Sequence, residues 1–146
     1  MKNESPGQIL IFSLGRAWLA LKRKGRKLLA EKQLDLTLEQ VMVLTMLYLE
    51  NGLNIGELSE RADRDRTTTS RMIAGLENKN LVLRIPDKKD SRGKLVYLTN
   101  LGKQKAETLM RFSDEVEKQV SKNLTESEIR ETARLVTKII ENLANS

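Results

Sequence analysis

The residues best suited to chemistry in this chain lie in two polar stretches near its middle. The first reads DRTTTSR, from Asp65 to Arg71, and the second reads PDKKDSRGK, from Pro86 to Lys94. Both combine cationic side chains with short hydroxyls, the groups that hydrogen-bond the bases and phosphates of nucleic acids. In isolation, the same residues are more typical of helix caps and solvated charges. Their role therefore depends on the elements that position them.

The composition excludes several classes of active site. The 146 residues include no cysteine and no histidine, which excludes thiol redox chemistry, Cys/His zinc sites and Ser-His-Asp triads. No spacing of the carboxylates and lysines assembles a nucleophile with a base, so we expect neither an enzyme nor a cofactor or metal site. The formal net charge of +6 favours a polyanionic partner instead.

The N-terminal segment does not resemble a targeting signal. Its polar start lacks the basic region of a signal peptide, and Arg16 interrupts the apolar run that follows. The chain also lacks a run of about eighteen apolar residues, so no transmembrane helix is predicted. We therefore expect a cytoplasmic protein without a membrane partner.

Hydrophobic periodicity predicts a mainly α-helical chain. Helices are expected at residues 7–33, 37–52, 54–62 and 65–79, followed by a long helix capped by Thr99 and a last helix that begins at Thr125. Capping boxes, Thr37 with Gln40 and Thr125 with Glu128, mark two of these starts. Gly52 is expected to end the second helix, because glycine is common just past a helix C-terminus.

A β-hairpin is expected between the fourth helix and the long helix. Its apolar residues alternate on one face of each strand: Leu81, Leu83 and Ile85, then Leu95 and Tyr97. Pro86 stops the first strand. Three helices and a two-stranded ribbon make a winged helix-turn-helix, which we assign to residues 35–99.

The terminal helices carry apolar stripes too extensive for that small domain to cover. Residues 1–34 and 100–146 are therefore predicted to form a helical dimerisation region, in which the stripes bury each other across a two-fold axis. A monomer that folds these helices back on itself is the alternative.

The helix at 65–79 is the predicted recognition helix. Thr69, Met72, Ile73 and Leu76 are expected to face inward. The polar residues that then face outward lie mostly in its first two turns: Arg66, Thr67, Thr68, Ser70 and Arg71. The DNA major groove admits an α-helix, and arginine can bond guanine O6 and N7 together. Beside a charged ribbon, this pattern favours a sequence-specific regulator that binds double-stranded DNA. The alternative is a winged helix that binds another protein, and its binding affinity would depend only weakly on salt concentration.

Residues 35–102 resemble the MarR family of bacterial transcription regulators. The resemblance lies in LTLEQVMVL (Leu36–Leu44), IGELSERA (Ile55–Ala62), DRTTTSRMIAGLENKNLV (Asp65–Val82) and PDKKDSRGKLVYLTNLGK (Pro86–Lys103). The last stretch carries the family's wing signature: Asp90, Ser91 and Arg92, then Leu98, Thr99 and Gly102. The resemblance implies a homodimer joined by its terminal helices, a recognition helix in the major groove, and entry of Arg92 into a minor groove.

Two positions depart from the family pattern. Arg64 stands where the family usually has an apolar residue, and we expect it to turn outward, where it can add a phosphate contact. Asn80 stands where the family usually has glycine, and asparagine tolerates positive φ. On the wing, Lys88 is a further candidate DNA contact. Asp90 is expected to pair with a nearby arginine and stiffen the loop, because an acid has no reason to approach phosphate.

Two further features are less specific. The MarR family often binds small anionic or aromatic compounds between the dimer layer and the winged domain. The candidate residues for lining such a pocket are Trp18, Met42, Met46 and Phe112. The alternative is that these four residues are ordinary core residues. The basic cluster KRKGRK, Lys22–Lys27, suits a DNA flank or an anionic surface, or is the solvated face of a helix. Gly25 within it indicates close packing or a bend. We expect, finally, a repressor that binds pseudo-palindromic DNA and dissociates from it when a ligand binds.

Overall fold

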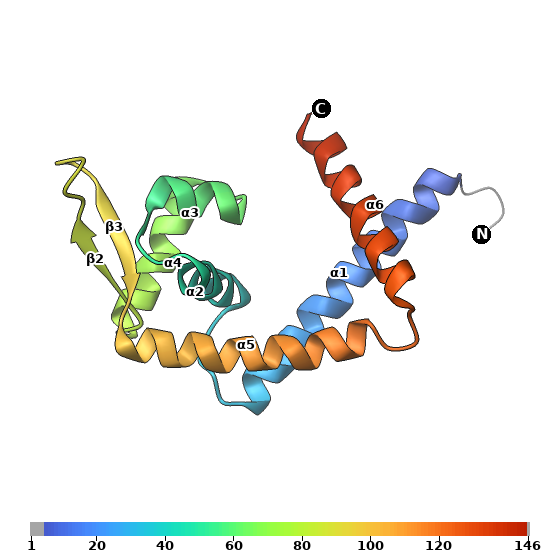
Figure 1. Cartoon of the computed structure of the whole chain (residues 1–146), viewed down its shortest axis with the longest axis horizontal. Coiled ribbons are helices and arrows are strands. Elements are labelled where there is room, and N and C mark those ends of the chain that lie inside the picture. The colour runs from blue at the N-terminus through green and yellow to red at the C-terminus, as the bar shows by residue number, and fades with distance from the viewer. Residues whose placement is uncertain (1–4, 146) are drawn as a thin grey trace. The chain divides into compact units, whose positions relative to one another are not determined.

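The computed structural model describes residues 5–145 of the chain (Figure 1). Its elements are α1 (Pro6–Glu31), α2 (Leu38–Leu49), β1 (Leu53–Asn54), α3 (Ile55–Ala62), α4 (Arg66–Asn78), β2 (Val82–Pro86), β3 (Lys94–Leu98), α5 (Asn100–Val120) and α6 (Glu126–Ala144). This helical architecture with a small antiparallel sheet confirms the predicted fold class. Within residues 5–145, no helix is long and apolar enough to cross a bilayer. Residues 1–4 and 146, which the predicted dimerisation region includes, lie outside the described range.

The chain forms two compact units, and the division falls between Phe112 and Ser113, inside α5. The first unit contains the hydrophobic core, to which α2, α3, α4, the sheet, the end of α1 and the start of α5 contribute. Its completely buried apolar side chains include Val43, Leu44, Leu47, Leu58, Ile73, Leu76 and Val96. The predicted inward face of α4 is thereby confirmed, and Thr69 is also buried. In the second unit, α6 contains no buried residue.

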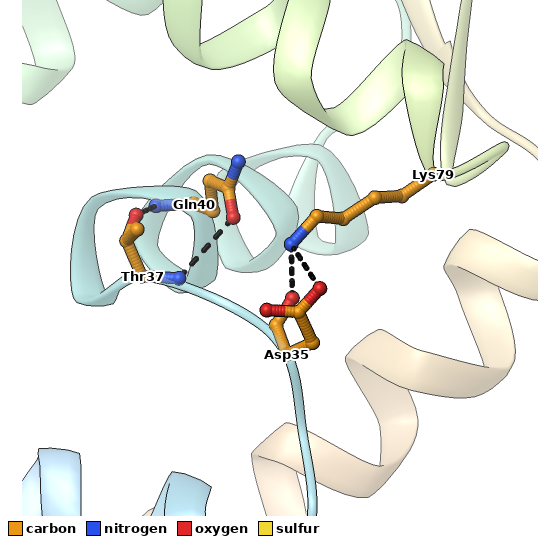
Figure 2. A network of polar contacts seen from close by, with 4 residues as sticks. All are labelled: Asp35, Thr37, Gln40 and Lys79. Atoms are coloured by element: carbon orange, nitrogen blue, oxygen red, sulfur yellow. Dashed lines mark hydrogen bonds and ion pairs between the residues drawn. The ribbon is translucent and has the colours of Figure 1, made fainter.

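Capping side chains set where the helices begin. Figure 2 shows the predicted box at α2, where the Thr37 N–H donates to Gln40 Oε1 at 3.2 Å and the Gln40 N–H donates to Thr37 Oγ1 at 3.1 Å. The predicted Thr125 box at α6 is present as well. A further box, which was not predicted, joins Asn54 and Glu57 at the start of α3. The chain thus satisfies otherwise unpaired N–H groups at these helix starts with local side chains.

The start of α2 is held close to α4. Lys79 Nζ lies 3.1 Å from Asp35 Oδ2 and also donates to the Asp35 carbonyl oxygen (Figure 2). The Asp35 side chain is 99% exposed, so this ion pair adds little stability. Close packing of α2 against α4 is the more important contact, because a Cβ added at Gly75 of α4 would lie only 2.7 Å from Gln40 Nε2 of α2.

Helix α2 ends earlier than predicted, at Leu49 rather than at Gly52. Glu50 leaves the helix in an extended conformation. Gly52 adopts φ +83°, and its N–H donates to the Val96 carbonyl oxygen at 3.1 Å. An added Cβ there would lie 2.8 Å from the ring of Tyr97. Gly52 therefore makes the turn from α2 into β1, a turn that only glycine accommodates without strain.

The sheet of the described residues has three antiparallel strands in the order β1-β3-β2, not the two that were predicted. The register confirms that the apolar wing residues share one face, with Leu83 opposite Tyr97 and Ile85 opposite Leu95. That face is the outer one, because Leu83 and Ile85 are exposed whereas Val82 and Val96 on the other face are buried. In Figure 1 the β2–β3 hairpin stands beside α4, with its tip pointing away from the start of α5.

The end of α4, both ends of the hairpin and the start of α5 meet at one junction. Asn80 has the predicted left-handed conformation, with φ +56°, and the buried Leu81 precedes β2 rather than belonging to it. The Thr99 N–H donates to the Leu81 carbonyl oxygen at 3.1 Å, and the Thr99 hydroxyl donates to the Asn80 carbonyl oxygen at 2.7 Å. The same hydroxyl accepts the Gly102 N–H at 2.9 Å, which confirms the predicted cap of α5. The residues of the Leu-Thr-x-x-Gly signature thus join the end of α4, the hairpin and the start of α5 through backbone contacts.

We predict that Gly102→Ala strongly destabilises the first unit. A Cβ at this position would lie 1.9 Å from the Leu81 carbonyl oxygen, so the start of α5 must move away from the end of α4. The expected loss is about 3 kcal/mol, the upper end of the usual cost of overpacking. Chemical denaturation measures it. The matched control is Gly7→Ala, where the new methyl would lie 3.9 Å from Ser5 Oγ, and a change under about 0.5 kcal/mol is expected. Equal stability of the two variants would contradict the prediction.

Candidate nucleic-acid interface

The N-terminus of α4 is built by Asp65, which caps it. Its carboxylate accepts the Thr68 N–H at 2.8 Å and the Thr68 hydroxyl at 2.6 Å. These hydrogen bonds, that of the Thr68 hydroxyl foremost, hold the pKa of Asp65 below its ordinary value. The Thr69 hydroxyl donates to the Asp65 carbonyl oxygen at 3.0 Å. Thr68, a predicted DNA contact, therefore uses its proton in the cap and keeps only its oxygen lone pairs for a ligand.

The outward face of α4 carries the remaining predicted contacts. An open hollow of about 460 Å³ is lined by Arg66, Thr67, Ser70 and Arg71, together with Ile55 and Ala74. Arg66, Thr67 and Arg71 are exposed, and Ser70 is half-buried. The spacing of these residues puts them on the same side of the helix over its first two turns. The structure thus brings together four of the five residues that were predicted to face a major groove.

A second hollow, of about 470 Å³, lies between α3, α4 and the wing. Its charged lining residues are Arg66, Arg84, Asp87, Asp90, Arg92 and Lys94. Arg66 and Ile55 line both hollows, so the two adjoin at the start of α4. The Arg66 side chain lies against Gly56, where an added Cβ would be 3.0 Å from Arg66 Nη2. Arg92 of the wing and Arg66 of α4 therefore border one basic groove.

The wing tip is organised by hydrogen bonds to its own backbone. Asp90 Oδ1 accepts the Arg92 N–H at 3.0 Å, and the Asp90 carbonyl oxygen accepts the Gly93 N–H at 2.9 Å. Asp87 closes the loop, because its N–H donates to the Gly93 carbonyl oxygen at 2.9 Å and its carboxylate accepts the Lys89 N–H at 2.8 Å. Asp90 thus shapes the tip as expected, but through the backbone of Arg92 rather than through an arginine side chain. The side chain of Arg92 is exposed.

Arg84 is a site residue that the sequence interpretation missed. It lies on β2 opposite Val96, on the inner face of the sheet. Its Nη2 lies 3.1 Å from Glu77 Oε2 and 3.5 Å from the Ser70 carbonyl oxygen. Its Nε is buried without a hydrogen-bond partner among the described residues. The available signal was a charged side chain at an inward position of a strand, opposite an acid on the preceding helix.

The remaining predicted DNA contacts lie outside the two hollows. Arg64 is exposed, as predicted, and its Nη1 donates to the Asp63 carbonyl oxygen at 3.0 Å. Lys88 is exposed at the wing tip.

In the basic cluster Lys22–Lys27, the Lys22 ammonium lies 5.5 Å from the centre of the Trp18 ring. Gly25 meets Leu38, because an added Cβ would lie 2.8 Å from Leu38 Cδ2, so close packing accounts for this glycine.

The four candidate ligand residues have different surroundings. Trp18 is 58% exposed on α1, whereas Met46 and Phe112 are partly buried against the hydrophobic core. Met42 is half-buried on α2. A separate groove of about 380 Å³ runs between the end of α1 and the start of α2, and none of these four residues lines it. A ligand site at these residues stays a prediction.

Comparison with known proteins places this arrangement among transcription regulators. Residues 36–94 match the model of the MarR family. The HTH-type transcriptional regulator YybA of Bacillus subtilis is 34% identical over 101 residues, which cover 69% of this chain and 67% of YybA.

Two similar solved structures contain DNA. The complex of Staphylococcus aureus MepR with DNA superposes with a TM-score of 0.81 at 28% identity, covering 96% of this chain and 99% of that one. A MarR family transcriptional regulator of Listeria monocytogenes, complexed with 26mer DNA, has a TM-score of 0.83 at 26% identity, covering 99% and 91% of the two chains. Two proteins with a fold similar to that of this chain therefore form complexes with DNA.

We predict that Thr68→Val raises the pKa of Asp65 toward its ordinary value of 3.8, because the Thr68 hydroxyl is the main cause of the depression. A carboxyl group with a depressed pKa adds stability above its unfolded pKa and loses it as the pH falls through the folded value. The variant should therefore lose part of this acid-range pH dependence of unfolding, because the backbone hydrogen bonds to the Asp65 carboxylate remain. Carbon-detected NMR titration of the Asp65 carboxyl measures the shift. Thr67→Val is the matched control, and an equal shift in both variants would contradict the role of the Thr68 hydroxyl.

Proposed function

Because the chain belongs to the MarR family of transcription regulators, we propose that it binds double-stranded DNA sequence-specifically as a homodimer. The observation that carries the proposal is the convergence of Arg66, Thr67, Ser70 and Arg71 on one face of α4, beside a basic groove that Arg92 borders. The DNA complexes of MepR and of the Listeria regulator support it. The protein acts by binding rather than by catalysis, in the cytoplasm.

Each element has a distinct role in the proposed complex. Helix α4 enters the major groove with its first two turns, where Arg71 reads base edges and the hydroxyls of Thr67 and Ser70 permit close approach. The wing reaches the adjacent minor groove, where Arg92 responds to groove width and negative potential. Arg64 and Lys88 contact phosphates, which fix position without reading sequence.

Exposed apolar side chains support the homodimer. On α1, Ile11, Phe12 and Leu19 are each more than 60% exposed, and on α6 Ile140 is 60% exposed. Large apolar side chains exposed on each of these helices favour an interaction with a partner that covers them. Terminal helices of two copies that cover these faces would give a two-fold dimer. Its two recognition helices would then read a pseudo-palindrome with half-sites roughly 34 Å apart.

Regulation follows from the spacing of the two recognition helices. A small anionic or aromatic ligand that binds one dimer shape better than another shifts the population toward that shape. If the ligand-bound shape places the two α4 helices at a distance that differs from one helical turn of DNA, the dimer dissociates from its operator. On this proposal the protein is a repressor, and Trp18, Met42, Met46 and Phe112 are the candidate ligand-lining residues.

The test is selection of bound sequences from a random duplex pool, repeated at several salt concentrations. The proposal expects an inverted repeat, and it expects affinity for that repeat to fall steeply with salt as phosphate contacts release counterions. Absence of an enriched sequence together with shallow salt dependence would instead favour a winged helix that binds another protein.

We predict that Arg92→Ala weakens binding to the selected duplex by about 1–3 kcal/mol without lowering the unfolding temperature. The side chain is exposed, and the loop uses only the backbone N–H of Arg92, so little folding energy is lost. Gel-shift titration and thermal unfolding measure the two quantities. Arg111→Ala on α5, also exposed, removes the same charge as a control. Unchanged affinity of the Arg92 variant would remove this residue from the interface.

We predict that Arg71→Ala relaxes sequence choice. If Arg71 bonds a guanine edge, the variant loses about 1–3 kcal/mol on the selected duplex but much less on random DNA. Parallel titrations on the two duplexes measure the difference. An equal loss on both would assign Arg71 to a phosphate contact instead.

A further inference from the structure

The β2–β3 hairpin is joined to α4 by a charged side chain. Arg84 of β2 reaches Glu77 Oε2 at 3.1 Å and the Ser70 carbonyl oxygen at 3.5 Å with the same nitrogen, Nη2. Ser70 and Glu77 are seven residues apart, so they lie two turns apart on one side of α4. The side chains of Arg84 and Glu77 are only 23% and 33% exposed, so the pair is less screened by salt than a surface pair.

Besides this attachment, β2 is held by its pairing with β3 and by the buried side chain of Val82. It is an edge strand in the order β1-β3-β2, paired with β3 alone. The tip beyond Pro86 is held by hydrogen bonds within the loop itself. Among residues 5–145, Arg84 makes the ion pair and the side-chain hydrogen bond that link the β2–β3 hairpin to α4. The direction of the hairpin relative to α4 therefore depends on a polar contact as well as on packing.

The same residue lines the basic groove together with the two arginines that border it. Arg66 at the start of α4, Arg84 on β2 and Arg92 at the wing tip line one hollow. In the proposed complex, α4 and Arg92 occupy adjacent grooves of one duplex, so both bind fully only if their separation matches that of the grooves. A small rotation of the hairpin about its base moves Arg92 much more than it moves Arg84.

We propose, on the basis of the DNA-binding function above, that the Arg84–Glu77 ion pair is a positioning clamp that sets Arg92 relative to the recognition helix. Glu77 then increases DNA affinity without touching DNA, although it carries a negative charge. A direct phosphate contact by Arg84 predicts the opposite, because Glu77 would then compete with phosphate for the guanidinium. The two roles differ in the sign of the effect of Glu77→Gln.

The test is a double-mutant cycle of Glu77→Gln with Arg92→Ala on the selected duplex at constant salt. With the clamp intact, Arg92→Ala is expected to weaken binding by about tenfold. In the Glu77→Gln background the same change should cost less than about threefold, because Arg92 is no longer held in its groove. Glu77→Gln alone should weaken binding. Glu60→Gln, on an exposed acid of α3, removes the same charge and should leave the penalty of Arg92→Ala unchanged.

Two further measurements separate positioning from folding. Without DNA, hydrogen exchange of the Asp87 N–H and the β2–β3 amides should be faster in Glu77→Gln, while the amides of α2 exchange as in the wild type. Arg84→Lys, which keeps the charge but loses the planar fork, should show the same reduced coupling to Arg92. It serves in place of Glu77→Gln if that variant does not fold.

The outcomes separate the clamp from the proposed function. Penalties of Arg92→Ala that agree within about twofold in both backgrounds, or tighter binding by Glu77→Gln, overturn the clamp and leave the DNA-binding function standing. A wild-type protein that binds no duplex in a salt-dependent manner overturns both.

Discussion

The contact between Gly102 and the backbone of Leu81 is the constraint on which the rest of the winged domain depends. Thr99 hydrogen-bonds both Asn80 and Leu81, so the hairpin leaves and returns at nearly the same point. That point is the end of α4, where the left-handed Asn80 turns the chain. A hairpin closed at this place must project beside the recognition helix. The junction thereby puts a reading helix and a charged ribbon on one side of a small domain.

Three acids near the basic groove are used in local hydrogen bonds. Asp65, Asp87 and Asp90 all direct their carboxylates at backbone N–H groups of a helix start or a turn. The carboxylates are therefore held close to the backbone, while the side chains of Arg66, Arg71 and Arg92 remain exposed. Exposed arginines beside acids that are already hydrogen-bonded suit a polyanionic partner. The acids fix the backbone conformation of the helix start and the wing tip, and the arginines supply the positive charge.

Much of the secondary structure could be predicted because its signals are local. The boxes at Thr37 and Thr125, the left-handed Asn80 and the inward face of α4 each depend on residues a few positions apart. Strand β1 was missed because two residues are too few to show alternation. The end of α2 was misplaced because Gly52 serves a turn against Tyr97, a residue distant in sequence. Family membership rests on the match of residues 36–94 to the MarR model and on YybA, which aligns with 69% of this chain.

The sequence by itself determined which residues cap, which face the core, and which charged side chains remain for a partner. Spacing and side-chain chemistry suffice for these, because helix and strand periods are properties of the backbone. Only the tertiary structure decided that Leu83 and Ile85 lie on the outer face of the wing and that Arg84 reaches Glu77. Each of these depends on which elements pack together. That packing follows from the contact of Gly102 with Leu81 and from burial of the shared core, and neither can be read from local spacing.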